Sequence, residues 1–253
     1  MRLKDKVAII TGGSRGIGFA TADKFLKEGA TVVLAASSQE SADVAVDKLK
    51  EKYPNAIVAG ISPNLASMES VRKAFKEATE KYGCVDILVN NAGISENTSF
   101  MDYTEETFDK VIDLNVKGVF NTTRVAAECM VARGKGVILS TSSMVSISGQ
   151  PSGVAYPASK FAVNGLTVSL AREASVYKGY KRDEIEMRGD RAEMSDFPLY
   201  LNTVAGGLDC RNQAIGGFSF VVKIYALPVV EIIGQFLYLL GRYGFDAQIG
   251  YCF

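Results

Sequence analysis

Tyr156 and Lys160 are the two residues whose types and spacing most directly suggest chemistry in this chain. They are four positions apart, so a helix that contains them carries both on one face. A free phenol has a pKa of about 10, and a nearby cation lowers it by favouring the phenolate. Such a pair could pass a proton to or from an alcohol or a ketone. The alternative is an exposed helix face, on which this spacing is common.

Two further polar residues could complete such a site. Ser143 precedes Tyr156 by thirteen residues, and its hydroxyl could donate to a substrate carbonyl or a developing alkoxide. Alternatively, Ser143 is one of several serines in an ordinary loop. Asn115 falls in the middle of a predicted helix, where asparagine is mildly unfavourable. It could bind a backbone carbonyl and a water that relays protons from Lys160, or it could be a buried structural asparagine.

Histidine is absent from the 253 residues, which leaves Tyr, Lys, Asp, Glu and Cys as possible general acids or bases. The four cysteines have neither CxxC spacing nor any clustering, so we expect no metal site. We interpret them as small apolar thiols, typical of a reducing compartment. They are Cys84, Cys129, Cys210 and Cys252.

The charges balance, with 28 Lys and Arg residues against 28 Asp and Glu residues. This balance offers no electrostatic footprint for nucleic acid or for an anionic membrane, and we expect neither as a partner. The N-terminal segment runs directly into an apolar strand and lacks the apolar region of a secretory signal peptide. These features favour a cytoplasmic protein.

A glycine-rich loop, Thr11 to Gly18, reads TGGSRGIG and falls between a predicted strand and a predicted helix. Its glycines would let the chain turn sharply and approach a pyrophosphate closely, while the helix N-terminus offers free N–H groups and a positive dipole end. The spacing is TGxxxGxG rather than GxGxxG, and an ordinary strand–helix turn is the alternative. The position of the loop in the first strand–helix–strand unit favours nucleotide binding.

The end of the second predicted strand indicates which nicotinamide cofactor is bound. Residues 35–39 read AASSQ and lack the acid that would hold the 2′-hydroxyl of NAD. Arg15 could pair with the 2′-phosphate of NADP, and Ser37 or Ser38 could donate to it. We therefore predict NADP rather than NAD. The alternative is that Arg15 is a solvated surface residue.

Strands and helices alternate along the first two thirds of the chain. We predict strands at 7–11, 31–36, 57–61, 87–89 and 137–140, and helices at 17–28, 41–53, 68–82, 105–130 and 156–171. This alternation is typical of a parallel sheet covered by helices on both faces. The predicted fold is therefore α/β, a doubly wound Rossmann-type sheet in a single domain. Such sheets bind ligands at their carboxyl edge, and Tyr156 follows the fifth strand there.

Taken together, these features resemble the short-chain dehydrogenase/reductase family over about residues 5–173. The cofactor loop, the strand-end sequence NNAG at 90–93 and the YPASK stretch at 156–160 occur in order at family spacing. The resemblance implies that Tyr156 gives or takes the proton, Ser143 orients the substrate oxygen and Asn115 holds a relay water. It also implies that Lys160 binds the nicotinamide ribose and lowers the pKa of Tyr156. The hydride itself is carried by the cofactor.

The predicted cofactor site combines the glycine loop, the serines after the second strand, the NNAG motif and the Tyr–Lys pair. Asn64, after the third strand, could contact the adenine edge or cap a turn, and the family usually has aspartate there. The predicted residues are Gly12, Ser14, Arg15, Gly16, Ile17, Gly18, Ser37, Ser38, Asn64, Leu65, Asn91, Ala92, Gly93, Tyr156 and Lys160.

Within the family, the glycine loop and the stretch around Tyr156 look most like bacterial bile-acid hydroxysteroid dehydrogenases. We therefore predict an oxidoreductase that transfers a hydride between NADP(H) and a small apolar secondary alcohol or ketone, a hydroxysteroid. One alternative is a 3-oxoacyl-[acyl-carrier-protein] reductase, for which Arg124, Arg133 and Lys135 could form a basic patch at the site mouth. Another is a nucleotide-binding protein without catalysis. The family commonly assembles through helices 105–130 and 156–172, so we expect a homodimer or homotetramer.

The C-terminal third does not match the family pattern. A strand and a Pro-Gly motif should follow the catalytic helix, but neither Pro198 nor Pro228 is followed by glycine. We therefore divide the chain into a Rossmann core, 1–173, and an atypical segment, 174–253, the expected place of the substrate loop and last strands. The segment could be a divergent folded substitute, an altered reading frame or a membrane-associating stretch. Charged residues and a proline interrupt the apolar run 221–240, which argues against a spanning helix.

Overall fold

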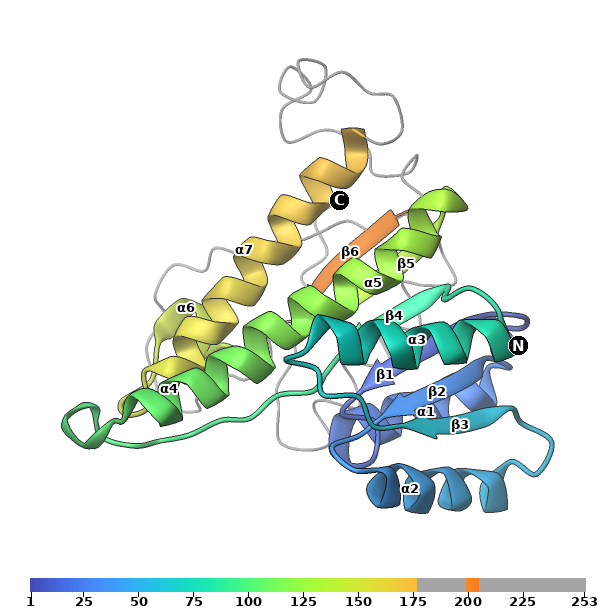
Figure 1. Cartoon of the computed structure of the whole chain (residues 1–253), viewed down its shortest axis with the longest axis horizontal. Helices are drawn as coiled ribbons and strands as arrows, with labels where there is room; N and C mark the ends of the chain where they lie inside the picture. Colours follow the sequence, from blue (N-terminus) through green and yellow to red (C-terminus); the bar gives the residue numbers. More distant parts are fainter. Residues whose placement is uncertain (177–198, 205–253) are drawn as a thin grey trace, which may run out of the picture.

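The structure is a computed structural model that describes residues 1–176 and 199–204 (Figure 1). Its centre is a six-stranded sheet in the order β3-β2-β1-β4-β5-β6, in which every neighbouring pair is parallel. The strands are β1 (Val7–Thr11), β2 (Thr31–Ala35), β3 (Val58–Ile61), β4 (Ile87–Asn90), β5 (Gly136–Thr141) and β6 (Leu199–Val204). The order reverses between β1 and β4, and ligands of open α/β sheets bind at the carboxyl ends of such strands.

The five predicted strands are confirmed, and their ends differ from the prediction by one residue at most. β6 corrects the expectation that no family-like strand follows the catalytic helix, because it lies parallel to β5 at the sheet edge. The other predictions for 174–253, including the apolar run 221–240, fall outside the described residues. Among the described residues, no helix is both long enough and apolar enough to span a membrane.

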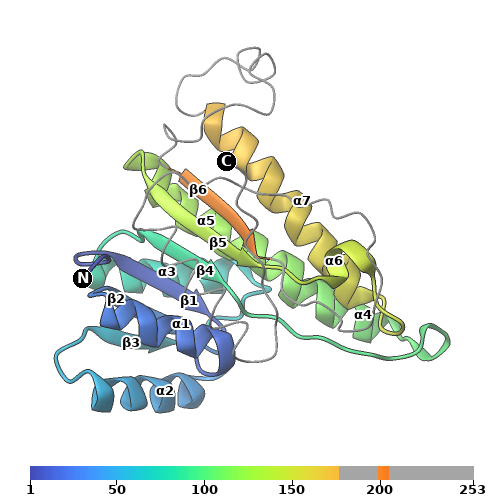
Figure 2. The ribbon, with the colours of Figure 1, turned by 180° about the vertical axis from the view of Figure 1, so that it is seen from behind.

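The helices form two layers, one on each face of the sheet. Figure 1 views the sheet from the side of α3, α5 and α7, and Figure 2 views it from the side of α1. The helices are α1 (Gly16–Lys27), α2 (Gln39–Lys52), α3 (Met68–Tyr82), α4 (Glu105–Ile112), α5 (Gly118–Ala132), α6 (Val145–Ser148) and α7 (Ala155–Val176). α7 therefore continues past residue 173, where the predicted core was expected to end.

Alternation along the strands builds a separate core under each layer. Ile10 of β1 packs with Phe25 of α1 and Leu49 of α2, whereas the adjacent Ile9 packs with Phe75 of α3 and Met130 of α5. Successive strand residues point to opposite faces, so a sheet covered on both sides needs apolar residues at every position. This explains why β1 is buried throughout.

The predicted helix 105–130 is not a single regular α-helix. α4 and α5 are joined by a π-helical turn at Asp113–Lys117. A π turn contains one extra residue, and such turns are frequent at functional sites. The periodicity of apolar residues predicts helix on both sides of the turn but does not reveal the insertion.

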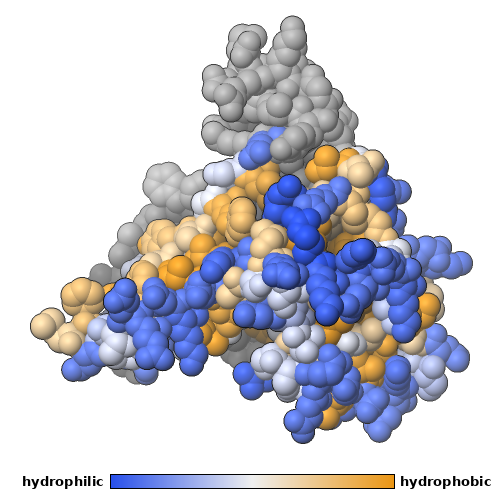
Figure 3. Space-filling view, in the orientation of Figure 1, coloured by the Kyte–Doolittle hydropathy of each residue, from blue (hydrophilic) through white to orange (hydrophobic). Residues whose placement is uncertain are grey.

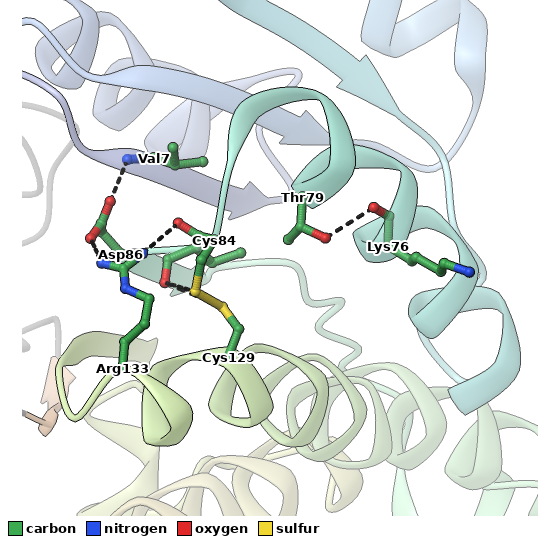
Figure 4. The surroundings of a disulfide bond; sticks show 8 residues. Val7, Lys76, Thr79, Cys84, Asp86, Cys129 and Arg133 are labelled. Atoms are coloured by element: carbon green, nitrogen blue, oxygen red, sulfur yellow. Dashed lines mark hydrogen bonds and ion pairs between the residues drawn. A yellow bond between two sulfur atoms is a disulfide. The ribbon is translucent and has the colours of Figure 1, made fainter.

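Cys84 and Cys129 form a disulfide, with their Cα atoms 6.0 Å apart (Figure 4). It joins the turn after α3 to the last turn of α5. The interpretation of these two cysteines as unpaired thiols is therefore wrong, because packing of α5 beside the start of β4 brings together residues 45 positions apart. Cys210 and Cys252 lie outside the described residues. Since disulfides persist mainly in oxidising compartments, the cysteines no longer support the cytoplasmic prediction.

An ion pair beside the disulfide ties the same elements together. Asp86 accepts the N–H of Val7 at 2.9 Å and pairs with Arg133, whose guanidinium also donates to the Cys84 carbonyl oxygen at 3.2 Å (Figure 4). The starts of β1 and β4 are thereby fixed to the end of α5. This cluster lies at the amino edge of the sheet.

Reduction of the disulfide should destabilise the protein. Closing a loop of this length removes chain entropy from the unfolded state worth about 4 kcal/mol, so dithiothreitol should lower the melting temperature by roughly 10 °C. Scanning calorimetry with and without the reductant measures the effect. The control is the double variant Cys84→Ala/Cys129→Ala, whose melting temperature should not respond. An equal response of both proteins would contradict a stabilising Cys84–Cys129 bond.

Candidate active site

The glycine loop between β1 and α1 packs directly against the end of β4. Gly12 has a φ of +65°, in the left-handed region that favours glycine. A Cβ on Gly18 would lie 2.3 Å from the Gly12 carbonyl oxygen, so a side chain there would clash with the backbone. Asn91 Nδ2 donates to the carbonyl oxygens of Thr11 at 3.2 Å and Gly12 at 3.3 Å. Thr11 Oγ1 accepts the N–H groups of Asn91 and Ala92, both at 3.0 Å.

The N-terminus of α1 has no cap from its own sequence. Arg15 occupies the N-cap position and makes no side-chain cap, and the first turn contains no acidic residue. The first N–H groups of a helix need an acceptor, and together with the helix dipole they suit an anion. The backbone around Ser14, Gly16 and Ile17 therefore stays the predicted site for the pyrophosphate of a dinucleotide.

Of the residues predicted to select NADP, Ser37 and Ser38 follow β2, and Arg15 lies in the glycine loop. A backbone hydrogen bond of 3.1 Å joins the glycine loop to the carbonyl oxygen of Ala35. Arg15 and Ser37 are exposed. Ser38 is the N-cap of α2, and its hydroxyl oxygen accepts the N–H of Ser41 at 3.2 Å. Ser38 thus has a structural role in addition to the predicted one.

Asn64 follows the turn-capping alternative. Its Oδ1 accepts the N–H of Ala66 at 3.0 Å, and its own N–H donates to Ser70 Oγ at 2.9 Å. The carbonyl oxygen of Leu65 accepts Asn121 Nδ2 at 2.8 Å. These bonds hold the segment after β3 against α5, and the contact of Asn64 with adenine stays a prediction.

Tyr156 and Lys160 share one face of α7. Lys160 Nζ lies 5.6 Å from the centre of the Tyr156 ring and donates to the Thr141 carbonyl oxygen at 2.8 Å. Lys160 is only 6% exposed. Burial disfavours the ammonium and lowers the pKa of Lys160 to about 8. The helix thus holds a largely desolvated cation beside a phenol.

Asn115 lies in the π turn and binds the peptide groups of a loop after β4. Its Oδ1 accepts the N–H of Ile94 at 2.9 Å, and its Nδ2 donates to the Ile94 carbonyl oxygen at 2.8 Å and to Ser159 Oγ at 3.0 Å. The predicted bond to a backbone carbonyl is therefore present. A Cβ on Gly93 would lie 3.2 Å from Asn115 Oδ1 and 3.7 Å from Lys160 Nζ. Because Gly93 has no side chain, the Asn115 and Lys160 side chains can both lie next to it.

Ser143 follows β5 at the turn into α6. Its carbonyl oxygen accepts the hydroxyl of Ser146 at 2.6 Å, and Ser146 Oγ accepts Asn164 Nδ2 at 2.8 Å. This chain of bonds fixes the Ser143 backbone to α7. Asn164 is not among the residues predicted from the sequence, although it follows Lys160 by four residues and so lies on the same helix face.

The basic patch expected for a carrier protein does not form at the site mouth. Arg133 pairs with Asp86 at the amino edge of the sheet, opposite the edge that Tyr156 follows. Lys135 directly precedes β5 and lies at the same amino edge. Arg124 pairs with Glu128 on α5. These three residues therefore do not support a carrier-protein reductase.

The chain is similar in sequence to short chain dehydrogenases. A family model described as short chain dehydrogenase matches residues 6–178. The chain is 58% identical over 173 residues to a 3alpha-hydroxysteroid dehydrogenase of Mediterraneibacter gnavus, covering 68% of this chain and 69% of that protein. It is 39% identical over 173 residues to the 3-oxoacyl-[acyl-carrier-protein] reductase FabG of Thermotoga maritima, covering 68% and 70%.

A solved structure shares the fold. NAD+-bound xylitol dehydrogenase superposes with a TM-score of 0.71 at 25% identity, covering 82% of this chain and 72% of that one. The sequence matches cover about two thirds of this chain, in agreement with the prediction that the family pattern ends near residue 173.

The buried Lys160 should give the protein a characteristic pH dependence of stability. The pKa of Lys160 is about 8 in the folded chain against 10.5 for an ordinary lysine, so between these values the unfolded state binds more protons. The wild-type free energy of unfolding should rise with pH across this range, relative to that of Lys160→Met, by about 3 kcal/mol in total. Urea unfolding at pH 7 and pH 10 measures the difference.

The control for this measurement is Lys48→Met, which removes an exposed lysine of α2. Its difference from the wild type should stay constant with pH over the same range. A constant difference for Lys160→Met as well would show that Lys160 is not a buried cation.

Proposed function

Because the chain belongs to the short-chain dehydrogenase/reductase family, whose members are oxidoreductases acting on CH–OH groups, we propose that it transfers a hydride between NADP(H) and a hydroxysteroid of the bile-acid kind. The observation that carries this proposal is the buried Lys160 ammonium beside the Tyr156 ring on α7. It supplies a proton-transfer group and a cation at the carboxyl edge of the sheet, where such folds bind their ligands.

Each side chain has a role that follows from its place. Tyr156 donates a proton to the substrate oxygen during reduction and removes it during oxidation. Ser143, held from α7 through Ser146, donates to the same oxygen. Lys160 holds the ribose of the cofactor, and Asn115 orients a relay water beside it. The bound nicotinamide supplies or accepts the hydride.

The substrate class rests on similarity and on charge. The relative named as a hydroxysteroid dehydrogenase is 58% identical, against 39% for the relative named as a carrier-protein reductase. Of the three basic residues considered for a carrier protein, Arg133 and Lys135 lie at the opposite edge of the sheet, and Arg124 pairs with Glu128 on α5. A small apolar hydroxyl or ketone compound therefore fits better than an acyl carrier.

The preference for NADP rests on Arg15 and Ser37 and on the absence of an acid after β2. Arg15 is exposed in the glycine loop and Ser37 is exposed after β2, so either can reach a 2′-phosphate without losing an internal bond that the structure describes. The uncapped N-terminus of α1 accommodates the pyrophosphate of either cofactor.

We also propose a homodimer or homotetramer. Several large apolar side chains of α4, α5 and α7 remain exposed, among them Phe108, Phe120, Phe161 and Val168. Figure 3 shows apolar residues gathered where α5 and α7 lie in Figure 1. Exposed apolar surface of this kind marks interaction sites, and light scattering of the purified chain measures the mass of the assembly.

Replacement of Tyr156 by phenylalanine should abolish turnover and leave cofactor binding intact, because only the hydroxyl is removed. The assay follows NADPH absorbance with bile-acid hydroxysteroids and their ketones and, in parallel, with 3-oxoacyl thioesters. We expect wild-type activity on the steroids and a loss of at least about 100-fold in Tyr156→Phe. Tyr53→Phe, at the partly buried C-terminal end of α2, is a matched control with unchanged rate.

The same screen separates the competing functions. Turnover confined to 3-oxoacyl thioesters would replace the steroid proposal by the carrier-protein reductase. Cofactor binding without turnover on either class would favour a nucleotide-binding protein without catalysis. Unaltered turnover by Tyr156→Phe would show that another group transfers the proton.

Replacement of Arg15 by alanine should weaken NADPH binding about 10-fold or more and leave NADH binding nearly unchanged, because only NADPH carries the 2′-phosphate. Fluorescence titration of both cofactors measures the two dissociation constants. The control is Arg72→Ala, which removes an arginine that pairs with Glu128 on the distant α5 surface. A wild-type protein that prefers NADH would disprove the NADP proposal.

A further inference from the structure

The catalytic helix α7 has no N-terminal cap from its own sequence. It begins at Ala155, and the preceding Val154 has no side-chain acceptor. Pro157 has no N–H, and the first helical hydrogen bond runs from the Ala158 N–H to the Val154 carbonyl oxygen at 3.2 Å. The N–H groups of the first turn, including that of Tyr156, therefore need an acceptor from elsewhere.

Glu96, sixty residues earlier in the chain, supplies that acceptor. Its Oε1 accepts the Tyr156 N–H at 3.4 Å, and its Oε2 accepts the Thr98 N–H at 3.1 Å. A carboxylate at a helix N-terminus is also favoured by the helix dipole. One side chain thus satisfies the backbone of the candidate proton donor and orders its own loop.

The loop that carries Glu96 is bound to the loop that precedes α7. Gln150 Nε2 donates to the carbonyl oxygens of Glu96 at 3.1 Å and Gly153 at 2.7 Å. The Gly153 N–H donates to the Thr98 carbonyl oxygen at 2.9 Å. A Cβ on Gly153, whose φ is +82°, would lie 2.3 Å from the Glu96 carbonyl oxygen. The two loops therefore meet too closely for any other residue at 153.

The same loop is bound at its start to another proposed catalytic residue. Asn115 binds both peptide groups of Ile94, two residues before Glu96. The short segment 94–98 therefore connects two contacts, one of Ile94 with the Asn115 side chain and one of Glu96 with the Tyr156 N–H. A shift of Glu96 would disturb the spacing between these two residues.

A partly buried tyrosine, Tyr103, lies beside the Glu96 carboxylate. Tyr103 Oη is buried without a formed hydrogen bond in the described part of the chain. Burial and the neighbouring Glu96 carboxylate raise the pKa of Tyr103 to about 12, against a smaller opposite effect of the Ala155 N–H. Tyr103 thus stays a neutral phenol beside Glu96.

We propose that Glu96 is a positioning residue for hydride transfer, because its carboxylate caps α7 and sets the place of Tyr156 relative to Asn115. This role rests on the proposed function of the Tyr156 site. Glu96 acts through the backbone and need not touch substrate or cofactor. Since a displacement of about 1 Å can cost roughly 100-fold in rate, the loss of the cap should affect turnover more than binding.

The kinetic test compares Glu96→Ala and Glu96→Gln with the wild type on the substrate found by the screen. Glu96→Ala should lower kcat by about 10- to 100-fold with little change in the KM for the cofactor. Glu96→Gln should recover part of the loss, because its amide oxygen can still accept the Tyr156 N–H. The matched control is Glu105→Ala, which removes an exposed carboxylate from the first turn of α4 and should leave kcat unchanged.

The second test does not depend on activity. Hydrogen–deuterium exchange of the peptides that cover 153–160 should be faster in Glu96→Ala than in the wild type, and unchanged in Glu105→Ala. If Glu96→Ala does not fold, the near-isosteric Glu96→Gln carries both comparisons, with a smaller loss expected.

The outcomes separate this inference from the proposed function. A wild-type protein without turnover would disprove the function, whereas exchange would still decide the cap. If Tyr156→Phe is inactive while Glu96→Ala keeps the wild-type kcat, the positioning role is wrong. Unchanged exchange at 153–160 in Glu96→Ala would likewise overturn it, as would an equal fall in kcat for Glu105→Ala.

Discussion

The paired hydrogen bonds between the Asn115 side chain and the Ile94 peptide hold the candidate site together. An asparagine amide can accept one N–H and donate to one carbonyl. It can therefore form with a single residue the same pair of hydrogen bonds that a neighbouring strand would form. To reach Ile94, Asn115 sits in a π turn between α4 and α5. The irregular turn is therefore stabilised by contacts outside the helix. The loop that it fixes carries the Glu96 carboxylate, which caps α7 beneath Tyr156.

The sheet supplies the frame for this arrangement because it places the ends of β1, β4 and β5 at one edge. Thr11 and Asn91 bind the glycine loop to the end of β4, and Lys160 binds the end of β5 through the Thr141 carbonyl. The cofactor side and the proton-transfer side are thus built on adjacent strands. Two separate cores, one on each face, pack the helices against the sheet.

The opposite edge of the sheet has a different character. The Cys84–Cys129 disulfide and the Asp86–Arg133 pair lie there and join β4 to α5. Neither touches the residues proposed for catalysis. The disulfide and the ion pair at the amino edge can therefore change without changing the residues proposed for catalysis at the carboxyl edge. Both groups of residues nevertheless depend on the helical segment formed by α4, the π turn and α5, which runs between them.

The amino-acid sequence by itself determined what depends on local periodicity and local backbone geometry. Five strands follow from short apolar runs, the glycine loop from its need for a sharp turn, and the shared face of Tyr156 and Lys160 from helix geometry. Only the tertiary structure decided which distant groups meet. The π turn, the Cys84–Cys129 bond, the place of Arg133 and the Glu96 cap each join segments far apart in the chain or depend on such a contact. Packing across the sheet determines which residues become partners, and the spacing of residues along the sequence does not reveal it.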